Sequence, residues 1–363
     1  MIDGSVLEGG GQLLRNALAL SVLTSSPISV TNIRKGRSRP GLKNQHVAGL
    51  RLAAEISSAD ISGDRTDSTA ITFHPQKISL PGSFEADPGT AGSTALLLQV
   101  ALPCLVFSPR TESSRLTLRG GTNAAHAPQI DYIEHVLFPF LQRHFDLVPK
   151  IQVHKRGYYP KGGGKVEVTI PPVRGPLPSV SLLERGEVTA VKGRAFVAGL
   201  PAELARRMQH AACDHITHAG IDSGLINIEA VRETNSTAFG SGSGIVLWAE
   251  TENGCVIGGS SLGSKQKDAT AVGKEAAAEL LSNLEHGACV DEYLQDQIIV
   301  FMALARGRSE VRTGPLTLHT RTAIWTAEQL TSAKFEIQED TISGTATIIC
   351  EGIGHTCDTR EGE

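Results

Sequence analysis

Glu8-Gly9-Gly10-Gly11-Gln12-Leu13-Leu14-Arg15 is the stretch from which the fold can be predicted. Its three glycines let the backbone turn tightly, including with positive φ, directly before a run of helix-forming residues. Apolar residues then recur at helical spacing over residues 12–23, and a β-branched strand is predicted over 28–33, after Pro27. The local element of the fold is therefore expected to be a glycine-rich turn, an amphipathic helix and a strand.

The same element recurs along the chain. Glycine-rich turns precede predicted helices at residues 9–11, 89–92 and 120–121. Further helices are predicted over 44–56, 91–105, 129–145, 291–306 and 322–333. Further strands are predicted over 70–73, 77–80, 115–119, 150–154, 165–170, 335–339 and 345–350. This alternation predicts an α/β fold of α+β repeats, in units of roughly 60 residues.

A proline-rich stretch marks a predicted domain boundary. Residues 171–178 read PPVRGPLP, and four prolines in eight residues exclude a helix or a central strand. The strands predicted beyond it are 188–197, 226–231, 245–251 and 255–261, and the helices are 201–218 and 269–284. We therefore predict a larger domain of residues 1–178 and 287–352, a smaller inserted αβ domain of 179–286, and a polar tail of 353–363. Residues 240–244, GSGSG, are expected to form a flexible loop.

Composition narrows the class of protein. The chain has 363 residues, 40% of them hydrophobic and 20% charged, which is typical of a globular protein with more than one core. The formal net charge of −4 excludes binding of polyanions by bulk charge. No secretory signal and no long apolar run is visible, so an intracellular protein without a membrane partner is expected. The six cysteines form no CxxC pair, which argues against a zinc site.

The first glycine-rich turn has the chemistry of a phosphate site. A helix that starts at such a turn presents free N–H groups and a partial positive charge. Arg15, one turn into the helix, has a guanidinium suited to phosphate oxygens, and Glu8 could hold a divalent cation. The segment is neither a Walker A motif nor a Rossmann fingerprint, and a solvated turn is the alternative.

A basic loop follows the first predicted strand. Residues 34–43 contain five cations among glycines and a proline, which makes them a candidate contact for phosphate or an RNA backbone. Arg34 follows the strand and is expected to point into a site more than Arg37 or Arg39. No aromatic residue is interleaved, so base stacking is not expected in this loop. A solvated surface loop is the alternative.

Two further segments carry polar chemistry. Residues 156–166, RGYYPKGGGKV, predict a tight exposed turn with adjacent cations, most simply a hairpin. On a helix, Tyr293, Asp296 and Gln297 share one face, which could stack on a base and hydrogen-bond to a ribose. A solvated helix face explains the same spacing.

His319 is the candidate nucleophile. It follows a Gly-Pro turn, between Thr317 and Thr320, where a strand gives way to a helix. A neutral imidazole can attack an α-phosphate and form a labile phosphoramidate. The chain has 12 histidines, and a packed or surface role is the alternative for any of them.

Taken together, these segments resemble the RNA 3′-terminal phosphate cyclase family. The resemblance runs in the family's order through DGSVLEGGGQLLRNALALS, IRKGRSRPGLKNQH, TAGSTALLLQVALPC, GGTNAAHAPQIDYI, RGYYPKGGGKVEV, DEYLQDQIIVFMALA and GPLTLHTRTAIWTAEQL. It covers nearly the whole chain. The segments GGTN…APQIDY and TGPLTLHT are closest to the eukaryotic branch.

The resemblance implies a fold and a reaction. The larger domain would contain three repeats, each a four-stranded sheet with two helices, and the insert would have thioredoxin-like topology. A histidine would attack ATP and form histidyl-AMP, the AMP would pass to an RNA 3′-phosphate, and the 2′-hydroxyl would displace it. The product would be a 2′,3′-cyclic phosphate. ATP and Mg²⁺ or Mn²⁺ would be required, and family members of this branch are nuclear.

The resemblance also implies roles for individual residues. His319 matches the nucleophile, Glu8 a metal-contacting carboxylate, and Arg15 and Arg34 phosphate-binding arginines. The positions that match nucleotide contacts are Gln99, Pro128, Tyr293, Asp296 and Gln297, and Gln45 matches a further polar position. Leu7 is a departure, because many members have glycine before the glutamate, and its side chain could alter how the loop approaches ATP.

Two alternatives stay open. Cyclase-like proteins of the same family lack the catalytic histidine and act in ribosome assembly on pre-ribosomal RNA. His319, together with Arg15 and Tyr293, favours the enzyme over such a non-catalytic factor. An enolpyruvyl transferase has a similar repeated architecture but needs no nucleophilic histidine in this setting. Oligomeric state, metal preference and the physiological RNA are not determined by the sequence.

Overall fold

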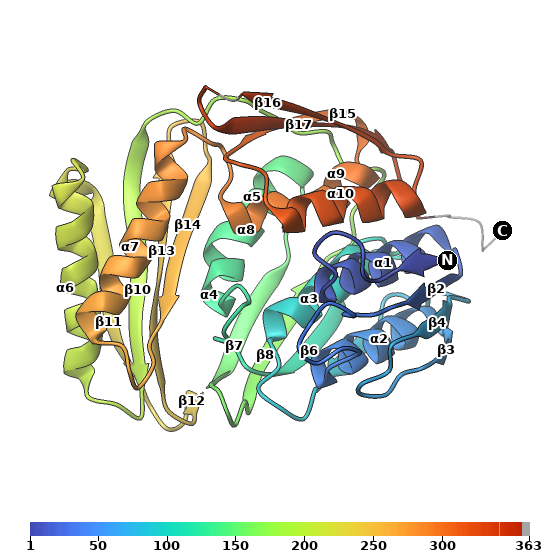
Figure 1. The fold of residues 1–363 in the computed structure, drawn as a ribbon, viewed down its shortest axis with the longest axis horizontal. Helices are drawn as coiled ribbons and strands as arrows, with labels where there is room; N and C mark the ends of the chain where they lie inside the picture. The colour runs from blue at the N-terminus through green and yellow to red at the C-terminus, as the bar shows by residue number, and fades with distance from the viewer. Residues whose placement is uncertain (341, 358–363) are drawn as a thin grey trace.

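The computed structural model describes residues 1–340 and 342–357, and its strands form four sheets (Figure 1). The first sheet has the order β1 (Ile2–Asp3), β2 (Ile28–Thr31), β4 (Ile71–His74), β3 (Asp60–Ser62). Its strands are linked by α1 (Gly11–Thr24) and α2 (Asn44–Ser57). β1 and β2 are parallel, whereas the other two pairs are antiparallel.

The second sheet repeats this plan. Its order is β5 (Ser83–Ala86), β6 (Ser114–Gly120), β8 (Gly164–Ile170), β7 (Lys150–Gly157), and a fifth strand, β12 (Ala238–Phe239), is added beside β7. The linking helices are α3 (Thr94–Leu105) and a continuous helical segment of α4 (Ile130–Tyr132), the π-helical η1 (Ile133–Leu137) and α5 (Phe138–Phe145). Among the four strands of the repeat, again only the first pair, β5 with β6, is parallel, and the added β12 is parallel to β7.

The third sheet completes the set. Its order is β9 (Ser181–Leu182), β15 (Arg306–Thr313), β17 (Thr345–Ile353), β16 (Lys334–Asp340), with β9 and β15 parallel. Its helices are α8 (Glu292–Gln297), α9 (Ile299–Leu304) and α10 (Leu318–Leu330). The shared strand order and pairing confirm the predicted α+β fold with three repeated units.

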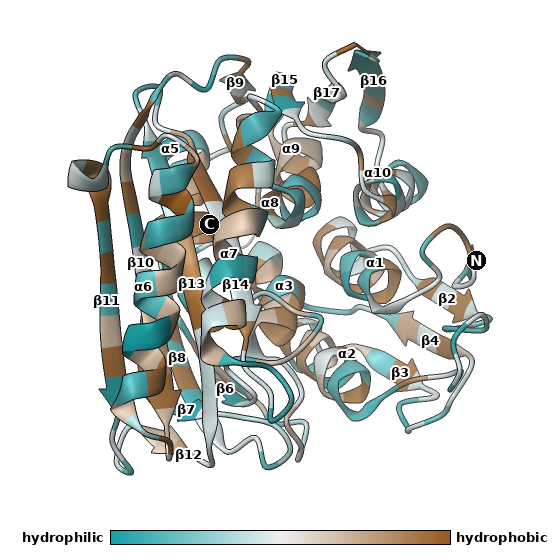
Figure 2. Cartoon of the chain, turned by 60° about the vertical axis from the view of Figure 1, so that its left-hand side comes forward, coloured by the Kyte–Doolittle hydropathy of each residue, from teal (hydrophilic) through white to brown (hydrophobic). Residues whose placement is uncertain are grey.

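The fourth sheet lies between β9 and α8 in the chain. Its order is β11 (Ile226–Glu233), β10 (Val188–Ala198), β13 (Gly242–Thr251), β14 (Val256–Leu262). The helices α6 (Ala202–His218) and α7 (Ala269–Glu285) cover one face of it, and α6 turns hydrophilic residues outward (Figures 1 and 2). A short 3₁₀ turn, η2 (Ser223–Leu225), precedes β11. The predicted domain bounds stay a prediction; β9 falls just inside the predicted start of the insert.

Several predicted elements differ from the structure. Residues 77–80 form no strand. β5, which the sequence does not predict, is a strand that pairs in parallel with β6. The predicted helix 291–306 ends early, because Arg306 begins a strand paired with β17. α10 starts at Leu318, four residues before the predicted helix. The predicted loop 240–244 is partly strand, since β13 begins at Gly242, where the ring of Tyr158 occupies the space that a Cβ would fill.

The predicted polar tail of residues 353–363 is described only in part. β17 runs to Ile353, and residues 358–363 lie outside the described residues.

Helices from all three repeats meet in the centre of the molecule. α1 packs against both α3 and α10, and its apolar side chains Leu13, Leu18 and Val22 are buried in the common core. The N-terminal ends of α1 and α10 are thereby fixed relative to each other, which positions the turns that precede them. Across residues 1–340 and 342–357, no helix combines the length and apolarity of a membrane span.

Candidate active site

The glycine-rich turn is shaped by the side chains packed against it. Gly9 has a φ of +58°, a conformation that favours glycine. At Gly11 a Cβ would collide with the imidazole of His46 and would lie 3.0 Å from a guanidinium nitrogen of Arg15. The glycines therefore allow two basic side chains to approach the first turn of α1.

His319 lies in the first turn of α10, with its side chain exposed. Thr317 caps this helix, because its hydroxyl accepts a hydrogen bond of 3.1 Å from the Thr320 N–H. The Nδ1 of His319 lies 2.7 Å from Oε1 of Gln12, which is on α1. The ring is thus held beside the residue that follows the glycine-rich turn.

Gln12 links His319 to the other predicted site residues. Its amide Nε2 donates to the carboxylate of Asp296 on α8. That bond orients the amide so that Oε1 faces His319. One turn along α1, the Nε of Arg15 donates to Oε1 of Gln99 at 2.9 Å. The structure therefore brings His319, Asp296, Arg15 and Gln99 together around one glutamine that sequence reasoning did not assign.

Burial and positive charge set the protonation states. The pKa of His319 is lowered by burial and by the charges of Arg15 and Arg37. Burial raises the pKa of Asp296 to about 7, against the influence of Arg15 and Gln12. Burial lowers the pKa of Arg15 to about 10, well above neutrality. Near pH 7 the imidazole is therefore neutral and the guanidinium is charged, which suits a nucleophile beside a phosphate.

Glu8 is fixed at the edge of this cluster. Its side chain is 9% exposed and forms an ion pair with Arg37. Its backbone N–H donates to the Thr322 hydroxyl at 3.2 Å, which ties the turn to α10. Oε2 of Glu8 is buried without a hydrogen-bond partner. A buried oxygen of this kind is suited to a cation. No group of three or more His, Cys, Asp or Glu side chains that could hold a metal occurs in the described part of the chain.

The basic loop presents a different arginine from the one expected. Arg34 has a φ of +55°, and its Nη1 donates to the carbonyls of Arg39 at 2.7 Å and Gly41 at 2.9 Å. It therefore braces its own loop, and Arg37 is the residue that reaches Glu8. The role of Arg34 at a phosphate stays a prediction.

Gln45 and His46 line the other side of the turn. The Gln45 Oε1 accepts from the Ser93 N–H at 3.2 Å, at the start of α3. His46 Nδ1 accepts from the Lys43 N–H at 2.9 Å, so the ring carries its proton on Nε2. Burial and the charges of Arg15, Arg34 and Lys43 lower its pKa to about 3. No role is predicted for His46 from the sequence.

Two of the positions that match nucleotide contacts line a large cavity. Pro128 and Tyr293 both face a space of about 1140 Å³ between the second repeat and the fourth sheet. The Tyr293 ring lies edge-on to Tyr132, with centroids 6.0 Å apart and planes at 76°. A narrow cavity beside it is lined by Gln12, Asn16, Gln99, Asp296 and Gln297, among others. In that cavity, the Nδ2 of Asn16 and the Oε1 of Gln297 are buried without hydrogen-bond partners.

Leu7, at which the chain departs from the family pattern, has a left-handed backbone conformation. Its φ is +54° and its side chain is 45% exposed beside Glu8. This left-handed conformation favours glycine, which is the residue that many members carry.

Comparison with known proteins identifies the family of the chain. The profile of the RNA 3′-terminal phosphate cyclase family matches residues 6–337. The chain therefore belongs to the RNA 3′-terminal phosphate cyclase family.

Several named relatives are similar over nearly their whole length. The RNA 3′-terminal phosphate cyclase of Drosophila melanogaster is 42% identical, over 98% of this chain and 96% of that protein. That of Methanosarcina barkeri is 44% identical, over 93% of this chain and 96% of that protein. The probable RNA 3′-terminal phosphate cyclase of Dictyostelium discoideum is 40% identical, over 98% and 83%.

Among solved structures, the enolpyruvyl transferase NikO from Streptomyces tendae aligns with 96% of this chain and 48% of its own. Its TM-score is 0.40 and its sequence identity is 9%.

Proposed function

We propose that the protein is an RNA 3′-terminal phosphate cyclase that uses ATP to convert a 3′-phosphate into a 2′,3′-cyclic phosphate. The observation that carries the proposal is the contact of 2.7 Å between His319 Nδ1 and Gln12 Oε1. An amide oxygen can only accept, so Nδ1 carries the proton and Nε2 presents a free lone pair. The ring thus faces the glycine-rich turn as a neutral nucleophile.

The first step is attack of Nε2 on the α-phosphorus of ATP. A P–N bond forms, the bond to the bridging oxygen breaks, and pyrophosphate leaves on the opposite side. Arg15 and Arg37 carry the positive charge that would bind the phosphates, with the α1 N-terminus behind them. Pro128 and Tyr293 would hold the adenine, and Asp296, Gln297 and Gln99 the rest of the nucleoside.

A divalent cation fits at Glu8. One carboxylate together with phosphate oxygens and water is a common environment for Mg²⁺. The unpartnered Oε2 of Glu8 is the protein ligand we assign to Mg²⁺ or Mn²⁺. When bound, the ion would neutralise charge on the leaving pyrophosphate.

The remaining steps move the adenylyl group. An oxygen of the RNA 3′-phosphate attacks the same phosphorus, the P–N bond breaks, and the imidazole is restored. The adjacent 2′-hydroxyl then attacks the RNA phosphorus, loses its proton, and expels AMP. Both attacks on the α-phosphorus are in line with His319, so the RNA phosphate enters where pyrophosphate left. Arg34 and Gln45 are the residues that we propose to contact this RNA phosphate.

The alternative is a non-catalytic factor that binds pre-ribosomal RNA. Such a factor has no use for an imidazole oriented by a buried glutamine, and the geometry of His319 therefore favours the enzyme. By its resemblance to the eukaryotic branch, we also propose a nuclear location.

Covalent labelling tests the proposal. Protein mixed with α-labelled ATP and Mg²⁺ should acquire an acid-labile label, and a 3′-phosphorylated RNA should discharge it and become cyclised. His319→Ala should abolish the label, whereas His74→Ala, at an exposed strand position, should keep it. A labelled His319→Ala variant would remove this residue from the reaction, and an unlabelled parent protein would favour the non-catalytic factor.

A further inference from the structure

The exposed turn between β7 and β8 is not used by the chemistry above, although it combines aromatic and basic side chains. Tyr159 is 81% exposed and Phe239, on β12 (Ala238–Phe239), is 42% exposed. The ammonium groups of Lys155 and Lys161 lie 5.4 Å and 5.8 Å from the centroid of the Phe239 ring. Neither lysine forms an ion pair among the described residues. An exposed ring flanked by free cations is typical of surfaces that bind single-stranded nucleic acid.

Phe239 reaches this turn through strand pairing. β12 runs parallel to the end of β7, with Phe239 opposite Gly157. The ring lies over Gly163, where a Cβ would collide with it. Gly163 also has a φ of +72°, so the turn needs glycine there for two reasons.

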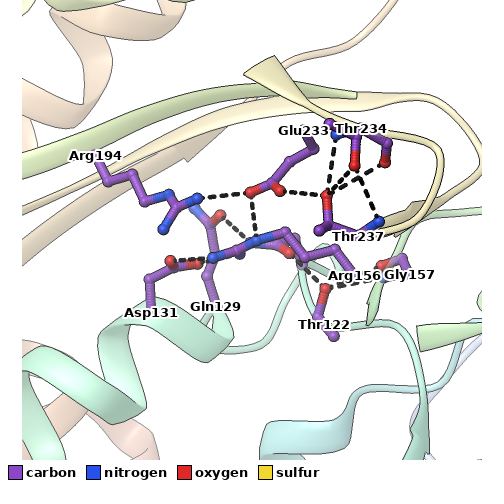
Figure 3. A network of polar contacts seen from close by, with 10 residues as sticks. Thr122, Gln129, Asp131, Arg156, Gly157, Arg194, Glu233, Thr234 and Thr237 are labelled. Atoms are coloured by element: carbon purple, nitrogen blue, oxygen red, sulfur yellow. Dashed lines mark hydrogen bonds and ion pairs between the residues drawn. The ribbon is translucent and has the colours of Figure 1, made fainter. Parts of the chain in front are cut away.

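A buried ion network anchors this pairing (Figure 3). Arg156 is 4% exposed and binds both oxygens of Asp131 at 2.7 Å. Its Nε pairs with Glu233 at 2.8 Å, and Glu233 in turn pairs with Arg194 at 2.7 Å. The Arg156 N–H donates to the Thr237 carbonyl at 2.7 Å, one residue before β12. Side chains of the second repeat and of the fourth sheet are thus held together beside β12.

The turn is continuous with the proposed phosphate site. A Cβ at Gly162 would lie 2.6 Å from the Thr90 carbonyl, so the turn rests on the segment 90–91. Two residues on, the Ser93 N–H binds Gln45, on the side where the RNA phosphate is proposed to enter. Tyr159 also lines the large cavity that Tyr293 faces. A strand that leaves the phosphate site past residues 90–93 therefore arrives at Tyr159 and Phe239.

We infer that Tyr159, Phe239, Lys155 and Lys161 form a stacking platform for single-stranded RNA, and that it binds the nucleotides upstream of the terminal 3′-phosphate. The platform rests on the proposed function, because it takes the RNA end to lie at the phosphate site. Bases of any sequence can stack on these rings, while the lysines contact the backbone, so recognition is independent of sequence.

The test compares substrates that differ in upstream nucleotides. Using the full-length protein, KM and kcat are measured for a 3′-phosphorylated octaribonucleotide and for a nucleoside 3′-phosphate. Tyr159→Ala/Phe239→Ala should raise KM for the octamer roughly five- to hundredfold, since stacking on one or two rings is lost, with kcat unchanged. KM for the nucleoside 3′-phosphate should not move, because it has no upstream base.

Control variants separate stacking from folding. Phe239→Tyr keeps the ring and should behave as the parent protein. Leu183→Ala removes another apolar side chain, 40% exposed, away from the platform and should also have no effect. Lys161→Gln should lower the dependence of octamer binding on salt, by about 0.7 in the slope of log Kd against log salt.

The outcomes are distinct. An octamer KM that is unchanged in the double variant, or that rises equally for both substrates, overturns the platform. Failure of the parent protein to accept label from ATP overturns the proposed function instead. In that case the Kd of a fluorescent octamer still tests the platform, which predicts weaker binding by the double variant.

Discussion

Gln12 offers a sharp test of how the imidazole is prepared for attack. It is 4% exposed, and it joins Nδ1 of His319 to Asp296. As the P–N bond forms, positive charge develops on the ring, so the bond from Nδ1–H to Oε1 becomes charge-assisted. Hydrogen bonds to charged groups contribute about 1.5–3 kcal/mol. Gln12→Leu keeps much of the volume and removes this acceptor, so the rate of self-adenylation should fall roughly ten- to 150-fold.

The assay is single-turnover formation of the labelled protein at pH 7, with thermal unfolding as a check on folding. Gln12→Glu should lose less rate than Gln12→Leu, because a carboxylate still accepts from Nδ1–H, although it no longer donates to Asp296. Its negative charge should also raise the pKa of His319, which shifts the acid limb of the rate profile to higher pH. A Gln12→Leu variant that labels within twofold of the parent rate would show that the glutamine does not orient the ring.

Two further predictions concern charge and backbone conformation. The charge of Arg37 contributes to the lowered pKa of His319, so the ring stays neutral to a lower pH than usual. Arg37→Gln should raise the pKa of His319 and move the acid limb of the self-adenylation rate profile to higher pH. An acid limb at the parent pH would contradict the assignment. Leu7 has a φ of +54°, which costs about 1 kcal/mol for a residue with a side chain. Because glycine also gains freedom in the unfolded chain, Leu7→Gly should raise the free energy of unfolding by at most about 1 kcal/mol in urea titration, and a clear destabilisation would contradict this account.

Local pattern predicted the elements well where the determinants are local. The glycine-rich turn and the apolar spacing after it predicted the first helix to within about one residue of α1. The sequence predicts His319 where a strand gives way to a helix, and it lies in the first turn of α10, after β15. What the pattern missed depends on distant partners. β5 exists because β6 lies beside it, and β12 because β7 does.

The site shows the same division. Residues with distinctive chemistry, such as His319 and Arg15, could be selected from the sequence and a family resemblance. Gln12 could not, since its role depends on Asp296 and His319, which lie far along the chain. Arg34 and Arg37 are both arginines of the same basic loop. The sequence favours Arg34 because it follows the strand, whereas in the structure its guanidinium binds a carbonyl of its own loop and Arg37 pairs with Glu8.

The pairing of β12 with β7 has a mechanical consequence. β12, which lies between strands of the fourth sheet in the chain, pairs over two residues with the edge of the second sheet, and the buried guanidinium of Arg156 forms ion pairs beside it. Moving the second repeat and the fourth sheet apart would break the strand pairing and the ion pairs together. It would leave buried charges without their partners, at a cost of several kcal/mol. We therefore expect the opening of the large cavity to keep a fixed width, so that side-chain motion controls the entry of substrates and the release of products.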